Sequence, residues 1–202
     1  MLNRFKVVLG TLVVLFIICF AFVFFSPYKT YDSEIKEIRN EILICKPIEE
    51  VFTYLGNSKN ASKWSVFVKD IIPLNADTCL DGSVNSIRRC FGKDVQLVNA
   101  YWDEVITEVK PNKKRQLAIY NFKNFTITAG GLLTEQIYDR IGPNETKLIF
   151  RLFYKKEMCG LLNDMKTYLV AYRIHDIFKQ NLSNIKIVVE IEKKSVCSIW
   201  HC

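Results

Sequence analysis

Hydrophobic residues dominate the N-terminal end of the chain. Residues 7–25 form an uninterrupted apolar run, VVLGTLVVLFIICFAFVFF, which is long enough for a helix to cross the hydrocarbon core of a bilayer. Arg4 and Lys6 precede the run, and Ser26-Pro27-Tyr28 follows it in place of the small residues of a cleavage site. We therefore expect a retained signal anchor, with a short tail over residues 1–6 and a transmembrane helix over residues 7–27.

A second long pattern, from Leu161 to Ile191, contains neither proline nor glycine. Its apolar residues recur at helical spacing, with a small change of phase in the middle: Leu162, Met165, Leu169 and Tyr172, then Ile174, Ile177, Phe178, Leu182, Ile185 and Val189. A helix of this length needs a large partner surface, because burial of its apolar stripe supplies most of its stability. We expect the rest of the domain to provide that surface.

Between residues 38 and 157 the pattern changes to strands and turns. A strand around 42–45 is followed by a helix opened by Pro47 and ended by Gly56, and then by a short helical turn over 57–64. Further strands are predicted at 65–74, after Gly82, at 95–109 and at 116–122. A last hairpin follows over 133–154, after a turn at Gly130-Gly131. This order predicts an α+β fold.

Charge and cysteine content narrow the possible functions. The net charge is +7, and the one dense basic cluster, Lys110 with Lys113, Lys114 and Arg115, lies in an expected turn. A solvated turn is a better interpretation than a nucleic-acid site, and a face towards an anionic membrane is the alternative. The seven cysteines include no CxxC pair and only two histidines accompany them, so we expect no zinc site. Buried thiols are expected, with a Cys197–Cys202 bridge as the alternative.

Three segments in the middle of the chain are similar in sequence to the corresponding segments of a known family. They are ILICKPIEEVFTYLGNSKNASKW (42–64), DGSVNSIRRCF (81–91) and WDEVITEVKPNKKRQLAIYNF (102–122). They resemble the START-like (SRPBCC) superfamily of polyketide cyclase/dehydrase and lipid-transfer-like proteins. One departure is Asn85, which stands where that family often has glycine.

The resemblance implies a helix-grip fold, an antiparallel sheet of about six or seven strands wrapped around the long C-terminal helix. The resemblance covers most of residues 38–192, and we expect the helix-grip domain over residues 38–194, with a linker over 28–37 and a tail over 195–202. It also implies an internal, mostly apolar cavity between the sheet and the helix.

Strand alternation indicates that one arginine must face this cavity. Arg88 and Arg89 are adjacent, so they point to opposite faces of a strand. Because Arg88 matches the arginine-containing strand of the family, we expect it to be the inward one, with Glu104 as its candidate partner. A structural ion pair and an anchor for a ligand both remain open.

The candidate cavity residues combine this pair with aromatic and apolar side chains. They are Trp64, Arg88, Trp102, Glu104, Tyr120, Tyr138, Phe153, Met165, Leu169 and Tyr172. No catalytic residue, metal ligand or cofactor is assigned. His175 and Asp176 lack an evident nucleophile, so catalysis by this pair is disfavoured.

Three functions fit these expectations. The first is a membrane-anchored module that binds a lipid or another hydrophobic small molecule, with the domain on the extracytoplasmic side. The second is a cyclase/dehydrase-type enzyme that uses the same cavity. The third is a packed module that binds a protein partner through its surface. The partners expected in the first case are the small molecule and the membrane, and no nucleic acid.

Overall fold

The computed structural model describes residues 2–30, 35–93, 99–125, 132–153 and 160–191. Its helices are α1 (Leu2–Phe24), α2 (Ile48–Gly56), the 3-10 turn η1 (Ser58–Asn60), α3 (Ala61–Trp64) and α4 (Leu161–Ile191). Its strands are β1 (Ile38–Ile44), β2 (Val68–Pro73), β3 (Ile87–Gly92), β4 (Tyr101–Lys110), β5 (Lys114–Lys123), β6 (Leu132–Gly142) and β7 (Glu145–Phe153). The expected strand start at Val95, the Gly130-Gly131 turn and the tail over 195–202 lie outside these residues.

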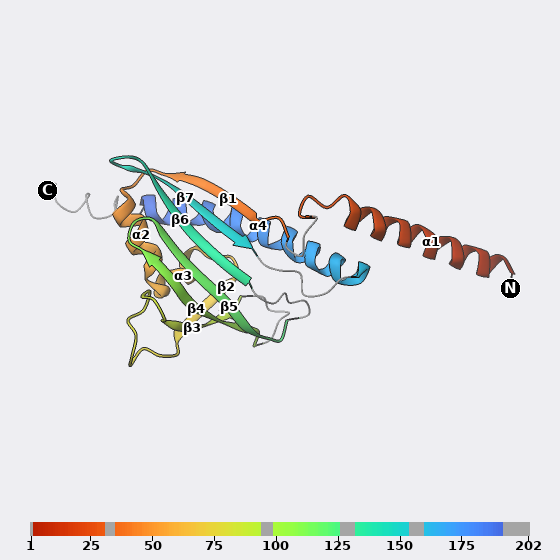
Figure 1. The fold of residues 1–202 in the computed structure, drawn as a ribbon, viewed down its shortest axis with the longest axis horizontal. Coiled ribbons are helices and arrows are strands. Elements are labelled where there is room, and N and C mark those ends of the chain that lie inside the picture. The colour runs from red at the N-terminus through yellow and green to blue at the C-terminus, as the bar shows by residue number, and fades with distance from the viewer. Residues whose placement is uncertain (1, 31–34, 94–98, 126–131, 154–159, 192–202) are drawn as a thin grey trace.

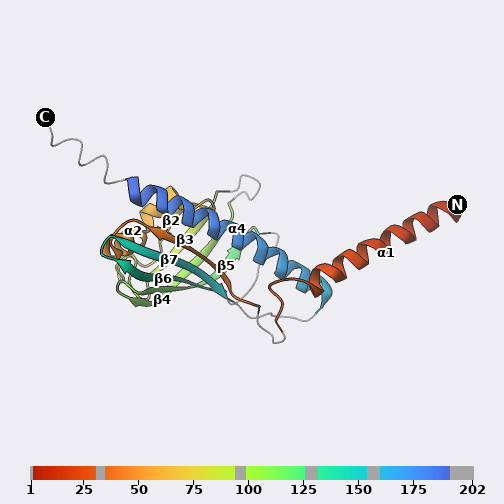
Figure 2. The same ribbon diagram turned by 90° about the horizontal axis from the view of Figure 1, so that it is seen from above.

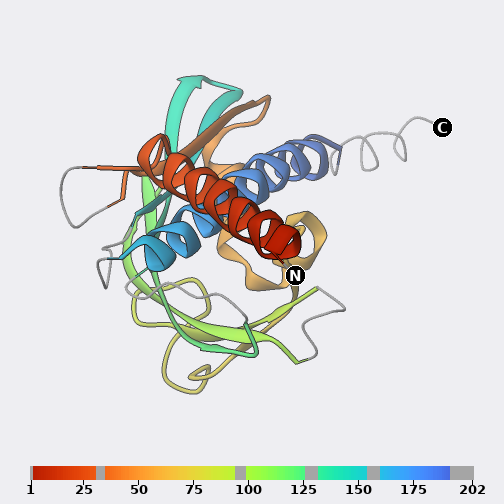
Figure 3. The ribbon, with the colours of Figure 1, turned by 90° about the vertical axis from the view of Figure 1, so that its right-hand side faces the viewer.

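The seven strands form one antiparallel sheet in the order β1-β7-β6-β5-β4-β3-β2. β1 pairs with β7, so that Ile38 lies opposite Leu152 although the two are far apart in sequence. The sheet curves around α4, and α2 and α3 lie beside that helix (Figures 1 and 3). This arrangement confirms the expected α+β helix-grip fold.

Helix α4 packs on the sheet, but not by the stripe expected in its first half. Leu182, which lies in the second half, is 2% exposed, as the pattern predicts. In the first half Leu162 is 74% exposed and Leu169 is 48% exposed, whereas Tyr168 and Ala171 are buried. The expected stripe is wrong there because Ile38 and Leu152 lie beside the Tyr168 side of the helix.

The start of α2 follows the expected pattern. Pro47 immediately precedes the helix, and Glu49 and Glu50 lie in its first turn, where their charge complements the helix dipole. Val51 and Leu55 bury the inner face of α2 against the second half of α4. The amphipathic helix thus covers one end of the concave face.

Helix α1 leaves the domain next to the beginning of α4 (Figures 1 and 2). The rings of Phe22 and Tyr28 contact that of Tyr172 on α4, with centroids 5.8 and 5.1 Å apart. Over Arg4–Phe24 the mean hydropathy is 3.1, and 6% of the most apolar window is buried. Among the described residues this is the one helix long and apolar enough to span a membrane.

The basic turn between β4 and β5 is only partly the solvated cluster that the sequence indicates. Lys110 and Lys114 both form ion pairs with Glu108. Arg115 instead begins the inward face of β5 and is 3% exposed. Its assignment to a solvated turn is therefore wrong, because strand alternation turns it away from solvent.

Candidate functional site

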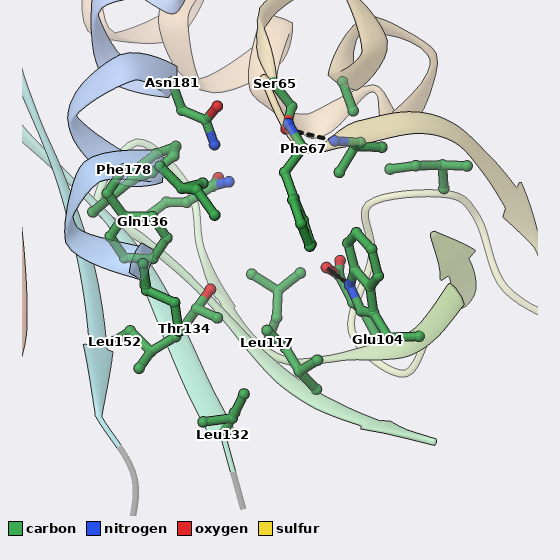
Figure 4. Close-up of a pocket in the computed structure, with 18 of the residues that line it drawn as sticks. Ser65, Phe67, Glu104, Leu117, Leu132, Thr134, Gln136, Leu152, Phe178 and Asn181 are labelled. Atoms are coloured by element: carbon green, nitrogen blue, oxygen red, sulfur yellow. Dashed lines mark hydrogen bonds between the residues drawn. The ribbon is translucent and has the colours of Figure 1, made fainter. Parts of the chain in front are cut away.

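A cavity of about 430 Å³ lies between the concave face of the sheet and α4. The lining side chains labelled in Figure 4 are Ser65, Phe67, Glu104, Leu117, Leu132, Thr134, Gln136, Leu152, Phe178 and Asn181. The first two come from the segment between α3 and β2, the last two from α4, and the others from β4 to β7. Apolar and aromatic groups make up most of this wall, as in typical pockets for small hydrophobic molecules.

Arg88 and Glu104 form an ion pair in the cavity wall. The two residues lie opposite each other on β3 and β4, and Nε of Arg88 donates to Oε2 of Glu104 at 3.0 Å. Nε1 of Trp102 donates to Oε1 of the same carboxylate at 2.9 Å. Burial opposes the charge of the Arg88 guanidinium, but Glu104 outweighs it and holds the pKa of Arg88 above its ordinary value. The expected inward arginine and its partner are confirmed.

The neighbouring pair faces the other side of the sheet. Arg89 donates to both carboxylate oxygens of Asp103, at 2.8 and 3.0 Å. Asn121 donates to the same carboxylate. These hydrogen bonds lower the pKa of Asp103. The two adjacent arginines thus form matched ion pairs on opposite faces, and only the Arg88 pair lines the cavity.

Five of the ten candidate residues line the cavity, and five do not. The lining ones are Trp64, Arg88, Trp102, Glu104 and Leu169. Their contact with a ligand stays a prediction. Leu169 is half exposed, as is its neighbour in the wall, Arg173, so this part of α4 borders the opening of the cavity.

Tyr138 and Phe153 miss the cavity for different reasons. Tyr138 is on the concave face, but the ring of Phe52 on α2 covers it, with centroids 5.0 Å apart. Burial raises the pKa of its phenol. Phe153 lies on the outer face, where the guanidinium of Arg151 sits over its ring, whereas Phe150 and Leu152 of the same strand line the wall.

Tyr120 is 41% exposed on the outer face, because it alternates with Leu117 and Ile119, which face the cavity. Strand β5 becomes irregular only at the next residue. Asn121 has a left-handed backbone with φ of 52°, and the pairing of β4 with β5 shifts there. An extra residue in one strand reverses the alternation beyond it. Ile119 and Phe122 therefore both line the cavity, although strict alternation would place them on opposite faces.

Met165 and Tyr172 face the junction with α1 instead of the cavity. Met165 packs on the cluster that contains Val23 and Ile35, and Tyr172 contacts the rings of Phe22 and Tyr28. Both expectations assumed that the first half of α4 turns its Leu162–Tyr172 stripe to the sheet. The helix is rotated, so these side chains meet α1.

Several wall residues were missed by the sequence analysis. The aromatic ones are Phe67, Phe122, Phe125, Phe150 and Phe178, and the polar ones include Thr134, Gln136 and Asn181. Some of them could have been predicted, because every second residue from Leu117 on β5 and from Phe150 on β7 lies on the same face of the strand. Phe67 could not have been predicted in this way, because it lies in an irregular segment between α3 and β2.

Nothing in the described part of the chain points to metal or thiol chemistry at this site. No group of three His, Cys, Asp or Glu side chains could hold a metal there. Cys90 is fully buried and unbridged, and burial raises the pKa of its thiol, which keeps it protonated. His175 approaches Asn40 at 3.5 Å and is outside the cavity wall.

Comparison with known proteins shows likeness in structure and not in sequence. No protein-family model matches the chain, and no curated protein matches it. The Zhui aromatase/cyclase from Streptomyces sp. R1128 has a TM-score of 0.59 at 11% identity, over 77% of this chain and 93% of that one. Ara h 8.0201 has a TM-score of 0.58 at 10% identity, over 76% and 97% of the two chains.

The di-domain ARO/CYC StfQ from the steffimycin biosynthetic pathway has a TM-score of 0.57 at 13% identity, over 78% of this chain and 51% of that one. At these identities the likeness shows the fold, which is consistent with the START-like fold that the sequence resembles. Such a fold supports many functions, so function must be argued from the cavity itself.

Proposed function

We propose that this helix-grip protein is a membrane-tethered module that holds a lipid or another hydrophobic small molecule in its internal cavity. The observation that carries the proposal is the cavity of about 430 Å³ with a mostly apolar and aromatic wall. Burial of an apolar ligand against this wall supplies affinity, at roughly 25 cal/mol per Å² of apolar surface removed from water. A packed module that acts only through its surface would have no use for such a cavity.

Two polar groups supply orientation inside the apolar wall. The hydroxyl of Thr134 and Nδ2 of Asn181 have no hydrogen-bond partner among the described residues, and both side chains line the cavity. Oδ1 of Asn181 already accepts from the backbone N–H of Val66 at 2.8 Å, which fixes the direction of its amide. A ligand with one or two hydrogen-bonding groups at an otherwise apolar body fits this arrangement.

The position of α1 supports ligand exchange with a bilayer. Its side chains from Val7 to Ile18 are about half to two-thirds exposed, as expected for a helix that lies in lipid. Its last turn docks on α4 beside Tyr172, one turn from the half-exposed Leu169 of the cavity wall. Tethering therefore keeps the opening close to the source of ligand and raises its effective concentration. Arg4 and Lys6 before the apolar run favour an extracytoplasmic domain.

The Arg88–Glu104 pair is the one observation that favours a cyclase/dehydrase-type enzyme as a second candidate. Both groups line the cavity within hydrogen-bond distance, as an acid–base pair would require. Both oxygens of Glu104 are, however, already occupied, by Arg88 and by Trp102. A carboxylate held in this way is better suited to a fixed polar wall than to proton transfer.

Native mass spectrometry on the 202-residue chain released from detergent tests the binding proposal. The protein is incubated with a total lipid extract, and the retained molecules are extracted and weighed. Thr134→Trp fills the cavity from near the start of β6, and Leu133→Trp places the same ring on the outer face of that strand. We expect the wild type and Leu133→Trp to retain one molecule of defined mass, and Thr134→Trp to lose it.

Equal retention by the two tryptophan variants would place the bound molecule outside the cavity and overturn the proposal. A wild type that retains nothing from the extract would also contradict it. Circular dichroism of both variants checks that the fold survives, so that loss of ligand reflects the filled cavity.

A further inference from the structure

Arg115 is a buried arginine without a carboxylate partner. Its side chain projects from the beginning of β5 and is 3% exposed. Nη1 donates to Oε1 of Gln136 at 3.2 Å and to the phenol oxygen of Tyr138 at 3.3 Å, both of them neutral acceptors. The ring of Phe52 covers the guanidinium, 4.5 Å from its centroid. Among the described residues no carboxylate lies within ion-pair distance of Arg115, so its charge is not compensated.

The donors left over are the two that usually hold an oxyanion. Nε of Arg115 is buried without an acceptor, and Nη2 makes no hydrogen bond to the described residues. In Arg89 this same Nε–Nη2 edge grips both oxygens of Asp103. An arginine fork matches carboxylate and phosphate geometry, and a buried charge normally has such a partner.

A polar cleft is lined in part by Arg115. It has a volume of about 470 Å³ and is lined by Thr53, Gly56, Asn57, Lys59, Asp81, Gly82 and Arg115. Lys59 is exposed at the cleft and adds a second positive charge. The carboxylate of Asp81 accepts from the backbone N–H of Ser58 at 3.0 Å. Two cations and one anion therefore leave the cleft with a net positive charge.

Two glycines keep the cleft open to the guanidinium. A Cβ atom at Gly56 would lie 2.8 Å from Nη2 of Arg115 and would cover it. Gly82 has a φ of +82°, and a Cβ atom there would lie 2.6 Å from the carbonyl oxygen of Gly56. Only glycine allows both the left-handed backbone and this close approach. The two chain segments meet without side chains at the point where Nη2 is reached.

We propose that this cleft binds an oxyanion of the phosphate class through the guanidinium of Arg115, with Lys59 as a second cation. Thr53 and Asn57 add a hydroxyl and an amide to the donors available for phosphate oxygens. The phosphate can be a free ion or monoester, or it can be the head group of a lipid. Gln136 is shared by Arg115 and the wall of the apolar cavity, but the cleft site does not depend on a ligand in that cavity.

Thermal unfolding of the 202-residue chain in a non-ionic detergent, followed by tryptophan fluorescence, tests this site. Inorganic phosphate is titrated at constant ionic strength, so that general screening does not change. We expect the melting temperature of the wild type to rise and saturate with phosphate. Arg115→Lys should weaken the apparent affinity about tenfold, which is the loss of one charge-assisted hydrogen bond.

Two further variants keep the test decisive if a change at Arg115 prevents folding. Lys59→Met removes the exposed cation and should weaken phosphate binding while leaving the phosphate-free melting temperature unchanged. Gly56→Ala places a methyl group against Nη2 and should abolish binding. Arg140→Met is the matched control, because Arg140 is an exposed arginine already paired with Glu49 on α2. It should keep the wild-type response.

Bilayer discs with and without phosphatidic acid separate the two sources of phosphate. One result would be that inorganic phosphate leaves the melting temperature unchanged while phosphatidic acid raises it in a way that depends on Arg115 and Lys59. That result would assign the site to a lipid head group. The proposal is overturned if neither probe raises the melting temperature. It is also overturned if Arg115→Lys, Lys59→Met and Gly56→Ala respond as the wild type does.

Discussion

Arg88 and Glu104 face each other across β3 and β4 within the wall of the cavity, with 9% and 13% of their side chains exposed. Trp102 completes the arrangement by donating to the second carboxylate oxygen. Three side chains thus combine two buried charges into a neutral unit in which both carboxylate oxygens of Glu104 accept hydrogen bonds. Burial makes such a pair costly to break from one side only.

Replacing Arg88 alone should therefore harm the fold more than replacing both partners. We expect Arg88→Met to lower the free energy of unfolding by about 3–5 kcal/mol, because it leaves Glu104 buried without its cation. The double variant Arg88→Met/Glu104→Leu should recover most of this loss. Urea unfolding of both single variants and the double variant gives the coupling energy. A stable Arg88→Met protein that no longer retains ligand would instead make Arg88 a ligand anchor.

Asp103 should make the stability depend on pH in the acid range. Its folded-state pKa is lowered, first by hydrogen bonding to Arg89. A lowered pKa contributes stability that is present above the unfolded-state value, about 3.9. That contribution is lost as the pH falls below this value through the folded-state pKa. The urea midpoint of the wild type should therefore drop between about pH 5 and pH 2.

Asp103→Asn should show a smaller drop over the same range, since it has no carboxylate to protonate. Asp139→Asn is the control, because Asp139 is a half-exposed carboxylate on strand β6 of the same sheet. A wild-type slope in Asp103→Asn would show that other carboxylates carry the acid sensitivity.

Two leucines on α4 should differ sharply in their contribution to the free energy of unfolding. Leu182 is 2% exposed in the core below α2, whereas Leu162 is 74% exposed. We expect Leu182→Ala to lower the free energy of unfolding by about 2–5 kcal/mol through the cavity it leaves. Leu162→Ala should change it by less than about 0.5 kcal/mol. Similar losses in urea unfolding would contradict the rotation of the first half of α4.

Replacement of Asn85 by glycine should leave the stability unchanged, whereas replacement by a β-branched residue should lower it. Its φ is 68°, a left-handed backbone that asparagine and glycine adopt more easily than other residues. Asn85→Gly should keep the stability within about 0.5 kcal/mol, and Asn85→Val should lower it by about 1–2 kcal/mol. Thermal unfolding measures both. Equal stability of the two variants would show that this turn relaxes.

The observed φ also explains the departure of this chain from the START-like pattern. Asn85 replaces a frequent glycine without changing the turn, because both residues adopt the left-handed conformation. The substitution preserves the local backbone, and β3 pairs with β4 in a regular register beyond it.

Local sequence patterns are enough to predict most of the elements and their order. Apolar spacing placed the long C-terminal helix, Pro47 placed the start of α2, and the adjacent arginines required one inward and one outward side chain. These features depend on local geometry, since helix and strand periods act on neighbouring residues along the chain. Arg88 and Glu104 could be paired for the same reason, once two consecutive strands were assumed to be neighbours.

The side of each element that faces the cavity follows instead from packing between distant segments. Alternation from Ile119, which faces the cavity, turns Tyr120 outward, and the left-handed Asn121 reverses the alternation beyond it, so that Phe122 faces inward. Contact with α1 turns Tyr172 away from the sheet, and α2 covers Tyr138. The sequence places Arg115 in a cluster of charged residues, but its burial depends on the residues that pack over it. The rotation of a helix and the cover of a strand are set by distant segments, which local spacing does not report.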